Sequence, residues 1–358
     1  MISKPTNSSL SSSAILFCST LKKPWLFLPA PFAHKLAAVA LPIAAQFGKW
    51  AYGHSKQQVT PVWKSLQWQN ILFKNPLGVA GGVDKEGSQL IHWENLGAGF
   101  MEVGTVTPKP QSANPGIIIG RDNLQKALWN KMGFPNLGIQ ALKDNLNSLE
   151  GKINFPLFIN IGKNRDTKNE DAIHDYIYCV RELAKVKLAN IFVINISSPN
   201  TKGLRDLQTK ESVSELLKSV RQTAGFEKKL LLKLSPDLNE HELKNILDVC
   251  LNDGADGVVL TNTTLQRPID LPFSTEEGGI SGEPLKKISR DFLIKTVSHV
   301  RGDENKNKHF LIVSVGGVTD LNEVQWRLNQ GADLVETYSA LIFDGPFFFK
   351  KAANYQWQ

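Results

Sequence analysis

The stretch LLLKLSPDLNEHELKNILDVCLNDGADGVVLT, residues 230–261, decides the fold. It opens with the apolar run Leu230–Leu234 and closes with a second run, Gly257–Leu260. Between the runs lie apolar residues at the spacing of a helix with one buried face: Leu243, Ile246, Leu247, Cys250 and Leu251. Asn239 and Glu242 resemble a capping box at the start of this helix. The stretch therefore predicts one strand–helix–strand unit.

Gly254, which follows the helix, lies where a C-terminal cap belongs. The same glycine–alanine pair recurs just before other apolar runs, at Gly97 and Gly331, so the unit is repeated. Runs of this kind predict eight strands: Leu77–Ala80, Phe100–Val103, Leu157–Ile161, Ile191–Ile196, Leu230–Leu234, Gly257–Leu260, Leu311–Val315 and Leu334–Tyr338. Eight strand–helix units within about 270 residues predict an α/β fold, a (β/α)8 barrel over residues 71–358. A doubly wound open sheet is the alternative.

Length and composition exclude several classes of protein. The chain of 358 residues is 42% hydrophobic and 21% charged, which is typical of a globular protein with a substantial core. Its three cysteines, Cys18, Cys179 and Cys250, are scattered and form no CxxC pair. Neither a disulfide framework nor a structural metal site is therefore expected.

The net charge of +7 comes from the N-terminal quarter of the chain. Residues 1–83 contain eight lysines and no acidic residue, and the rest of the chain is close to neutral. This distribution does not predict a nucleic-acid-binding body. Residues 1–23 are a Ser-rich leader of unknown role, whose apolar stretch Ala14–Phe17 is too short for a secretion signal. An organellar transit peptide is the alternative for this leader.

Two apolar runs, Pro24–Ala33 and Leu36–Gly48, follow the leader. Each is shorter than the roughly 20 residues of a membrane span. His34 and Lys35 separate the runs, and Pro42 is expected to break the second. Apolar and aromatic residues mixed with lysines suit helices that lie in the interface of an anionic membrane. A lysine-bearing cap packed on the barrel is the alternative.

In a (β/α)8 barrel the chemistry lies at the carboxyl ends of the strands, and here every end carries glycine or a polar side chain. In strand order these residues are Ala80-Gly-Gly-Val-Asp-Lys85, Gly104-Thr105, Asn160, Asn195-Ile-Ser-Ser-Pro-Asn200, Lys233, Thr261-Asn-Thr263, Gly316-Gly317 and Tyr338-Ser339. A mouth lined by amides, hydroxyls and two lysines suits a flat polar heterocycle and a phosphate.

The glycine pair Gly316-Gly317 and the pair Tyr338-Ser339 occupy the usual phosphate position of this fold, which implies a phosphorylated cofactor. Lys233 lies within a strand and is expected to point into the mouth. Its amine suits either the Schiff-base nucleophile of an aldolase or a cation that stabilises a reduced flavin. The residue types alone do not decide between these roles.

Seven segments carry a resemblance that does decide: NPLGVAGGVDK (75–85), EVGTVTPKPQ (102–111), NIGKN (160–164), NISSPNTKGLR (195–205), TNTT (261–264), GGISG (278–282) and VGG (315–317). In their order and spacing, from about residue 30 to residue 350, they resemble the class 2, quinone-linked dihydroorotate dehydrogenases. The resemblance implies an FMN-containing barrel that oxidises dihydroorotate to orotate in pyrimidine biosynthesis and passes the electrons to membrane quinone.

The resemblance also assigns residues by motif position. The FMN ligands would be Ala80, Gly81, Gly82, Thr105, Asn160, Asn195, Lys233, Thr261, Gly282, Gly317, Tyr338 and Ser339. The dihydroorotate pocket would hold Lys85, Asn130, Lys131, Met132, Gly133, Phe134, Asn195, Asn200, Asn262 and Thr263. Arg121 and Tyr338 would border the quinone site. Ser198 falls where class 2 enzymes place their catalytic base and class 1 enzymes have cysteine; otherwise it merely closes the Ser-Ser-Pro-Asn turn.

The chain departs from the family pattern at several positions. The departures are Gly81 for alanine, Ile117-Ile118 for Pro-Arg, Lys131 for arginine, Pro135 for asparagine, Ser314 for glycine and Glu336 for glutamine.

We therefore expect a monomeric peripheral membrane protein with a helical membrane and quinone segment over residues 24–70, bound FMN, no metal and no nucleic-acid partner. The expected location is the cytoplasmic face of a bacterial inner membrane, with the mitochondrial inner membrane as the alternative. Two other functions stay open: a phosphate-binding aldolase or isomerase that uses Lys233 or Lys85, and an FMN-binding membrane protein without activity.

Overall fold

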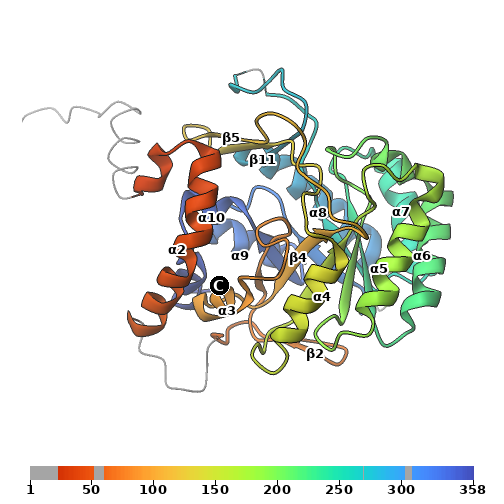
Figure 1. Ribbon diagram of the computed structural model, residues 1–358, viewed down its shortest axis with the longest axis horizontal. Coiled ribbons are helices and arrows are strands. Elements are labelled where there is room, and N and C mark those ends of the chain that lie inside the picture. The colour runs from red at the N-terminus through yellow and green to blue at the C-terminus, as the bar shows by residue number, and fades with distance from the viewer. Residues whose placement is uncertain (1–22, 52–59, 269, 303–308) are drawn as a thin grey trace, which may run out of the picture.

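The computed structural model describes residues 23–51, 60–268, 270–302 and 309–358 (Figure 1). Of the leader predicted over residues 1–23, only Lys23 lies within this part of the chain. The described residues form a closed parallel barrel with helices around it, a small antiparallel sheet, a short hairpin and an N-terminal helix.

The eight predicted strands form the barrel, so the (β/α)8 prediction is confirmed and the open sheet is excluded. Each strand is parallel to its neighbours, and the last strand closes the barrel against the first. The strands are β3 (Leu77–Val79), β4 (Met101–Val106), β7 (Leu157–Ile161), β8 (Ile191–Asn195), β9 (Lys229–Leu234), β10 (Gly257–Leu260), β12 (Leu311–Ser314) and β13 (Leu334–Thr337).

Helices surround the barrel, as Figure 1 shows. They are α3 (Leu90–Leu96), α4 (Gly138–Ser148), α5 (Ala172–Leu183), α6 (Lys210–Ala224), α7 (Glu240–Asn252), α8 (Glu283–Arg301), α9 (Leu321–Asn329), α10 (Ser339–Phe343) and α11 (Phe348–Ala353), with 3-10 turns η2 (Asn169–Asp171) and η3 (Leu204–Leu207). The predicted capping box of Asn239 and Glu242 is present at the start of α7. Gly254 has a φ of +99°, a conformation that favours glycine just after a helix.

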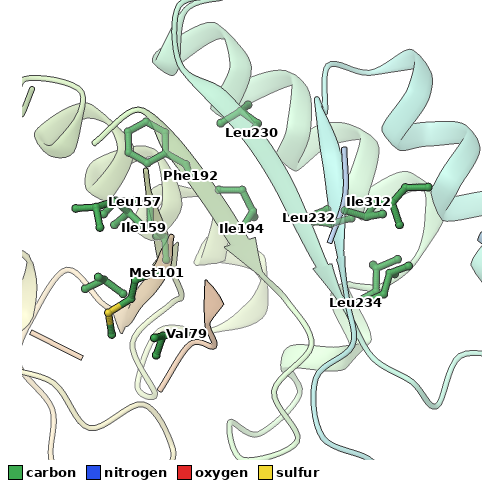
Figure 2. Close-up of a cluster of buried hydrophobic side chains, with 14 of the residues drawn as sticks. Val79, Met101, Leu157, Ile159, Phe192, Ile194, Leu230, Leu232, Leu234 and Ile312 are labelled. Carbon is green, nitrogen blue, oxygen red and sulfur yellow. The ribbon is translucent and has the colours of Figure 1, made fainter. Parts of the chain in front are cut away.

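The period of two along each strand divides the apolar side chains between two core regions. Phe158 and Val193 belong to the cluster inside the barrel, whereas Leu157 and Ile159 belong to the cluster between barrel and helices. Figure 2 shows residues of this outer cluster. The hairpin of β1 (Leu66–Trp68) and β2 (Ile71–Phe73) adds Trp68 and Phe73 to the inner cluster.

Two small sheets were not expected from the sequence. The hairpin β1–β2 spans residue 70, where a domain boundary was predicted; that boundary stays a prediction. The second sheet, which we call the lid sheet, joins β5 (Ile119–Asp122), β6 (Ala127–Asn130) and β11 (Gly279–Gly282) in the order β11-β6-β5. It lies near the carboxyl ends of the barrel strands, because Ile280 of β11 pairs with Thr264 just after β10.

The N-terminal segment begins with η1 (Pro24–Phe27) and continues as α2 (Ala30–Ala51). The predicted break at Pro42 is wrong, because α2 runs through this residue as one helix. Proline removes one backbone hydrogen bond, but Leu41 and Ala45 on either side of it are buried in the outer core cluster and hold the helix there. No helix in the described residues is long and apolar enough to cross a membrane.

Candidate active site

The inward-facing positions of the barrel strands become polar at the carboxyl ends. Asn160 lies two residues after Phe158, and Lys233 lies two residues after Leu231, so both continue the inner faces of their strands. Asn160 Nδ2 donates to Glu102 Oε1 at 2.7 Å. The structure thus places polar groups from neighbouring strands in contact above an apolar interior.

Asn195 connects this layer to the next strands. Its Nδ2 donates to Asn160 Oδ1 at 3.1 Å and to Thr105 Oγ1 at 3.2 Å. Ser197 Oγ donates to Asn195 Oδ1 at 3.1 Å, and Asn262 Nδ2 donates to that hydroxyl at 3.1 Å. Residues assigned from separate motifs therefore form one hydrogen-bonded network of amides and hydroxyls.

A buried charge cluster lies beside the amides. The Lys233 ammonium donates to Glu102 Oε1 at 2.5 Å. Burial disfavours its charge, but the carboxylates of Glu102 and Glu336 outweigh burial and raise the pKa of Lys233. Burial and repulsion from Glu102 raise the pKa of Glu336 well above its usual range. Lys233 and the two acidic residues therefore form one electrostatically linked cluster.

The sequence motifs predict no role for Glu102, and Glu336 stands out in them only as a departure from the family pattern. Both side chains are fully buried, and Glu102 Oε2 and both Glu336 oxygens have no hydrogen-bond partner among the described residues. The signal was present: each is an acidic residue within an apolar strand, on the same inward period as Lys233. Unpaired buried oxygens of this kind are rare away from functional sites.

The loop after β8 carries Ser198, which is buried. Ser198 Oγ accepts the Asn200 backbone N–H at 3.2 Å, and its own proton has no acceptor among the described residues. Asn200 Nδ2 donates to Asn130 Oδ1 of β6 at 2.7 Å, whereas Asn200 Oδ1 is buried without a partner. The lid sheet therefore holds this loop in place through Asn130. Asn200 Oδ1 remains available to accept a hydrogen bond from a ligand.

Arg205 joins two of the loops at the mouth, a role that the sequence did not predict. Its guanidinium donates to Ser197 O at 2.8 Å and to Thr263 O at 2.7 Å. Asp237 accepts from Arg205 Nη1 at 2.6 Å. The assigned residue Thr263 is held next to Asn262, whose Oδ1 accepts the Thr263 N–H at 2.8 Å.

The mouth fits the FMN that the resemblance implies. The backbone N–H groups of Gly317, Tyr338 and Ser339 donate to no other described residue, and Gly317 and Ser339 are buried. Buried donors of this kind require an acceptor, and three of them suit a phosphate. At Gly81 a Cβ would lie 1.9 Å from Glu102 Oε1, so glycine lets the backbone approach this carboxyl without a shift of the Glu102 side chain.

The other assigned FMN positions lie around these groups. Gly82 N donates to Gly104 O at 2.8 Å, which joins the turn after β3 to β4. Ala80 is buried in the inner cluster, and the buried Thr261 follows β10. Gly282 ends β11 and begins α8, with a φ of +81°.

Lys85 is held at the end of the glycine turn, where its ammonium donates to Gly82 O at 2.8 Å. Burial lowers the pKa of Lys85, and Asp84 and Glu86 offset part of this effect. Burial and the charge of Lys85 also lower the pKa of His34 on α2. The N-terminal helix thus brings His34 within electrostatic reach of the site, whereas the sequence pattern indicated His34 only as a separator of two apolar runs.

The assigned segment 131–134 follows β6. The Phe134 ring packs closely against Gly162, the Met132 carbonyl accepts the N–H of Asn114, and Gly133 O accepts from a glutamine side chain. Lys131 pairs with Glu277 at 2.6 Å, and the Glu277 side chain is 83% exposed. The Lys131 ammonium is therefore engaged in a surface ion pair rather than with the buried amides.

Arg121 and Tyr338 both border η1. Arg121 Nη2 donates to the carbonyls of Leu26 and Leu28 at 3.0 and 2.9 Å. Leu26 packs in a small cluster with Phe343 and Tyr338. The two residues assigned to the quinone site thus meet the same turn of the N-terminal segment.

Comparison with known proteins agrees with this geometry. The family model "Dihydroorotate dehydrogenase" matches residues 65–354. A dihydroorotate dehydrogenase (quinone) from Acinetobacter baylyi is 37% identical over 345 residues, 94% of this chain and 98% of that protein. Its counterpart from a Psychrobacter species is 38% identical over 91% of this chain and 93% of its own length. The crystal structure of the Eimeria tenella enzyme in complex with ferulenol is 30% identical, with a TM-score of 0.76 over 88% of this chain and 89% of that one.

Proposed function

The chain belongs to the dihydroorotate dehydrogenase family, and from this membership we propose how its own residues perform the reaction. It is the quinone-dependent enzyme, an FMN oxidoreductase that converts dihydroorotate to orotate in pyrimidine biosynthesis. The observation that carries this function is the charged Lys233 buried among Asn160, Asn195 and Glu102, which gives a flavin both amide partners and a cation. Because Glu102 keeps Lys233 protonated, Lys233 is unsuited to the Schiff-base chemistry of an aldolase.

Substrate orientation falls to the groups around Ser198. Lys85 would pair with the substrate carboxylate. Asn200, Asn262 and Asn130 would meet the ring amides, since each side chain offers both a donor and an acceptor. The unpartnered Asn200 Oδ1 supports this proposal, because it lacks the donor that a ring N–H would supply.

Ser198 Oγ acts as the base: its own proton passes to a water molecule as the oxygen takes the proton from the substrate carbon. The Asn200 N–H donated to this oxygen stabilises the negative charge that develops on it. The residues assigned to FMN would hold it beside the neighbouring carbon, where its chemistry would be to accept a hydride and to make the electrons available to quinone. Lys233, held protonated by the carboxylates, supplies positive charge at this layer of the barrel.

The N-terminal helix provides the membrane contact. Phe32, Leu36, Val39 and Ile43 of α2 are 56%, 44%, 71% and 72% exposed, and their spacing places them on one face. The opposite face is buried against the barrel through Leu41 and Ala45. An exposed apolar stripe on a helix suits insertion into a membrane interface. The protein is a monomer attached in this way to the cytoplasmic face of a bacterial inner membrane, with residues 24–70 as the segment that admits quinone.

The function is tested with two electron acceptors and the double variant Val39→Glu/Ile43→Glu. Burying each of these side chains in the membrane interface contributes about 1.5–3 kcal/mol to the free energy of membrane binding. We expect the variant to lose binding to anionic liposomes and to reduce a long-tailed quinone in those vesicles at least about tenfold more slowly. Dihydroorotate oxidation with a soluble dye acceptor should stay at the native rate, because the barrel is untouched.

Phe226→Glu is the matched control, because Phe226 is 84% exposed and lies just after α6, away from α2 in the chain. It should leave both acceptors and liposome binding unchanged. Equal loss with both acceptors in the α2 variant would refute the membrane role. No turnover of dihydroorotate by the native protein with either acceptor would refute the function itself.

A further inference from the structure

Arg327 of α9 is a fully buried arginine that the reaction described above does not use. Its Nε donates to Glu323 Oε1 at 2.8 Å, and Glu323 also pairs with Arg290 of α8. Burial lowers the pKa of Arg327 to about 10, so the guanidinium remains charged at neutral pH. Its other nitrogens reach Ser314 Oγ and Ser289 Oγ, both at 2.7 Å.

The remaining acceptor of this guanidinium is the carbonyl of Gly316, after β12. Arg327 Nη2 donates to Gly316 O at 2.6 Å, and Ser289 Oγ donates to the same oxygen at 2.7 Å. The peptide between Gly316 and Gly317 is planar and trans, so its carbonyl and the Gly317 N–H point in opposite directions. Because Arg327 and Ser289 hold the Gly316 oxygen in place, they also fix the direction of the Gly317 N–H.

The peptide needs this restraint because glycine lies on both sides of it. Gly316 and Gly317 have φ values of +110° and +73°, and two adjacent glycines leave the peptide plane free to rotate. The Gly317 N–H is one of the three donors at the mouth without a partner among the described residues. A rotated peptide would present an oxygen there, and an oxygen repels a phosphate.

We propose that Arg327 is a positioning residue for the cofactor phosphate: with Ser289 it holds the Gly316 carbonyl so that the Gly317 N–H faces the anion. The inference rests on the proposed function, because it takes FMN as the ligand. It also gives a role to Ser314, whose hydroxyl lies behind the glycine pair and binds Arg327.

The test compares FMN with riboflavin, which has the same ring and no phosphate. Apoprotein is titrated with each flavin, and binding is followed by flavin fluorescence. Hydrogen bonds to charged groups contribute enough that Arg327→Met should weaken FMN binding about 10- to 100-fold. Riboflavin affinity should change by less than about threefold. Arg327→Lys should recover part of the loss, because lysine can still donate to Gly316 O.

Arg327→Met leaves Glu323 with one partner fewer and could unfold the chain, so Ser289→Ala provides a second, uncharged test. This substitution removes a donor to Gly316 O and should also weaken FMN binding more than riboflavin binding. Arg221→Met is the matched control, since Arg221 is another buried arginine that binds backbone carbonyls, those of Lys228 before β9 and Gly254 after α7. It should leave the ratio of FMN affinity to riboflavin affinity unchanged.

Equal losses of affinity for both flavins in the Ser289 and Arg327 variants would overturn the inference. Failure of the native protein to bind either flavin would instead overturn the proposed function.

Discussion

Replacing Ser198 with alanine should leave FMN bound and slow flavin reduction by dihydroorotate by about 10²- to 10⁴-fold, the usual contribution of a general base. The substitution removes only the hydroxyl that accepts the Asn200 N–H, and no cofactor contact assigned above depends on it. The measurement is anaerobic stopped-flow reduction of the bound flavin, which isolates the half-reaction from quinone chemistry.

Ser197→Ala is the matched control for this prediction. Ser197 is the adjacent residue, is also buried, and binds Asn195 and Asn262 instead of lying free for a substrate proton. Loss of the Ser197 hydroxyl should slow flavin reduction by about tenfold or less. Ser198→Cys should retain more activity than alanine, with its pH dependence moved to lower pH because a thiol ionises more readily than an alcohol. Similar reduction rates for Ser198→Ala and the native protein would remove Ser198 from the mechanism.

Replacing Lys233 with methionine should produce the largest loss of stability. The cation is paired with Glu102 at 2.5 Å in a fully buried site, and removing one partner of such a pair costs about 3–5 kcal/mol. The variant should also bind FMN more weakly and shift its reduction potential to more negative values, because a positive charge near the reduced flavin is lost. Denaturation of the apoprotein at neutral pH measures the first effect, and a redox titration measures the second.

A double variant identifies the cause of that loss. Without Lys233, the Glu102 carboxylate stays buried without its cation, and this unpaired charge is the expected source of the penalty. Lys233→Met/Glu102→Gln should recover most of the stability at neutral pH, because no buried charge remains. A loss of stability that persists in full in the double variant would mean that Lys233 acts through packing alone.

The barrel could be predicted because its strands are buried on both faces and therefore appear as short apolar runs. The runs Leu157–Ile161 and Gly257–Leu260 coincide with β7 and β10, and the ends of the other runs differ from those of their strands by at most three residues. The lid sheet could not be predicted in this way. Its strand β5 reads Ile-Gly-Arg-Asp, which has no apolar alternation, and its partner β11 lies far along the chain.

The sequence placed the site residues at the strand ends, but not the groups that control their charge and direction. Glu102 and Glu336 act on Lys233 only because the closed barrel brings β4, β9 and β13 around one interior. Arg327 reaches Gly316 from a helix outside the barrel. Such contacts depend on side-chain direction across elements far apart in the chain, which periodicity and motif spacing do not encode.

One half-reaction is central to the proposed function: electrons must pass from dihydroorotate to a flavin held at the mouth of the barrel. The direct measurement is the visible spectrum of the purified holoprotein, recorded anaerobically before and after addition of excess dihydroorotate. We predict a yellow protein whose flavin band bleaches on addition of dihydroorotate and returns when a quinone is added. A protein that holds FMN but keeps its flavin band unchanged in the presence of dihydroorotate would contradict the account.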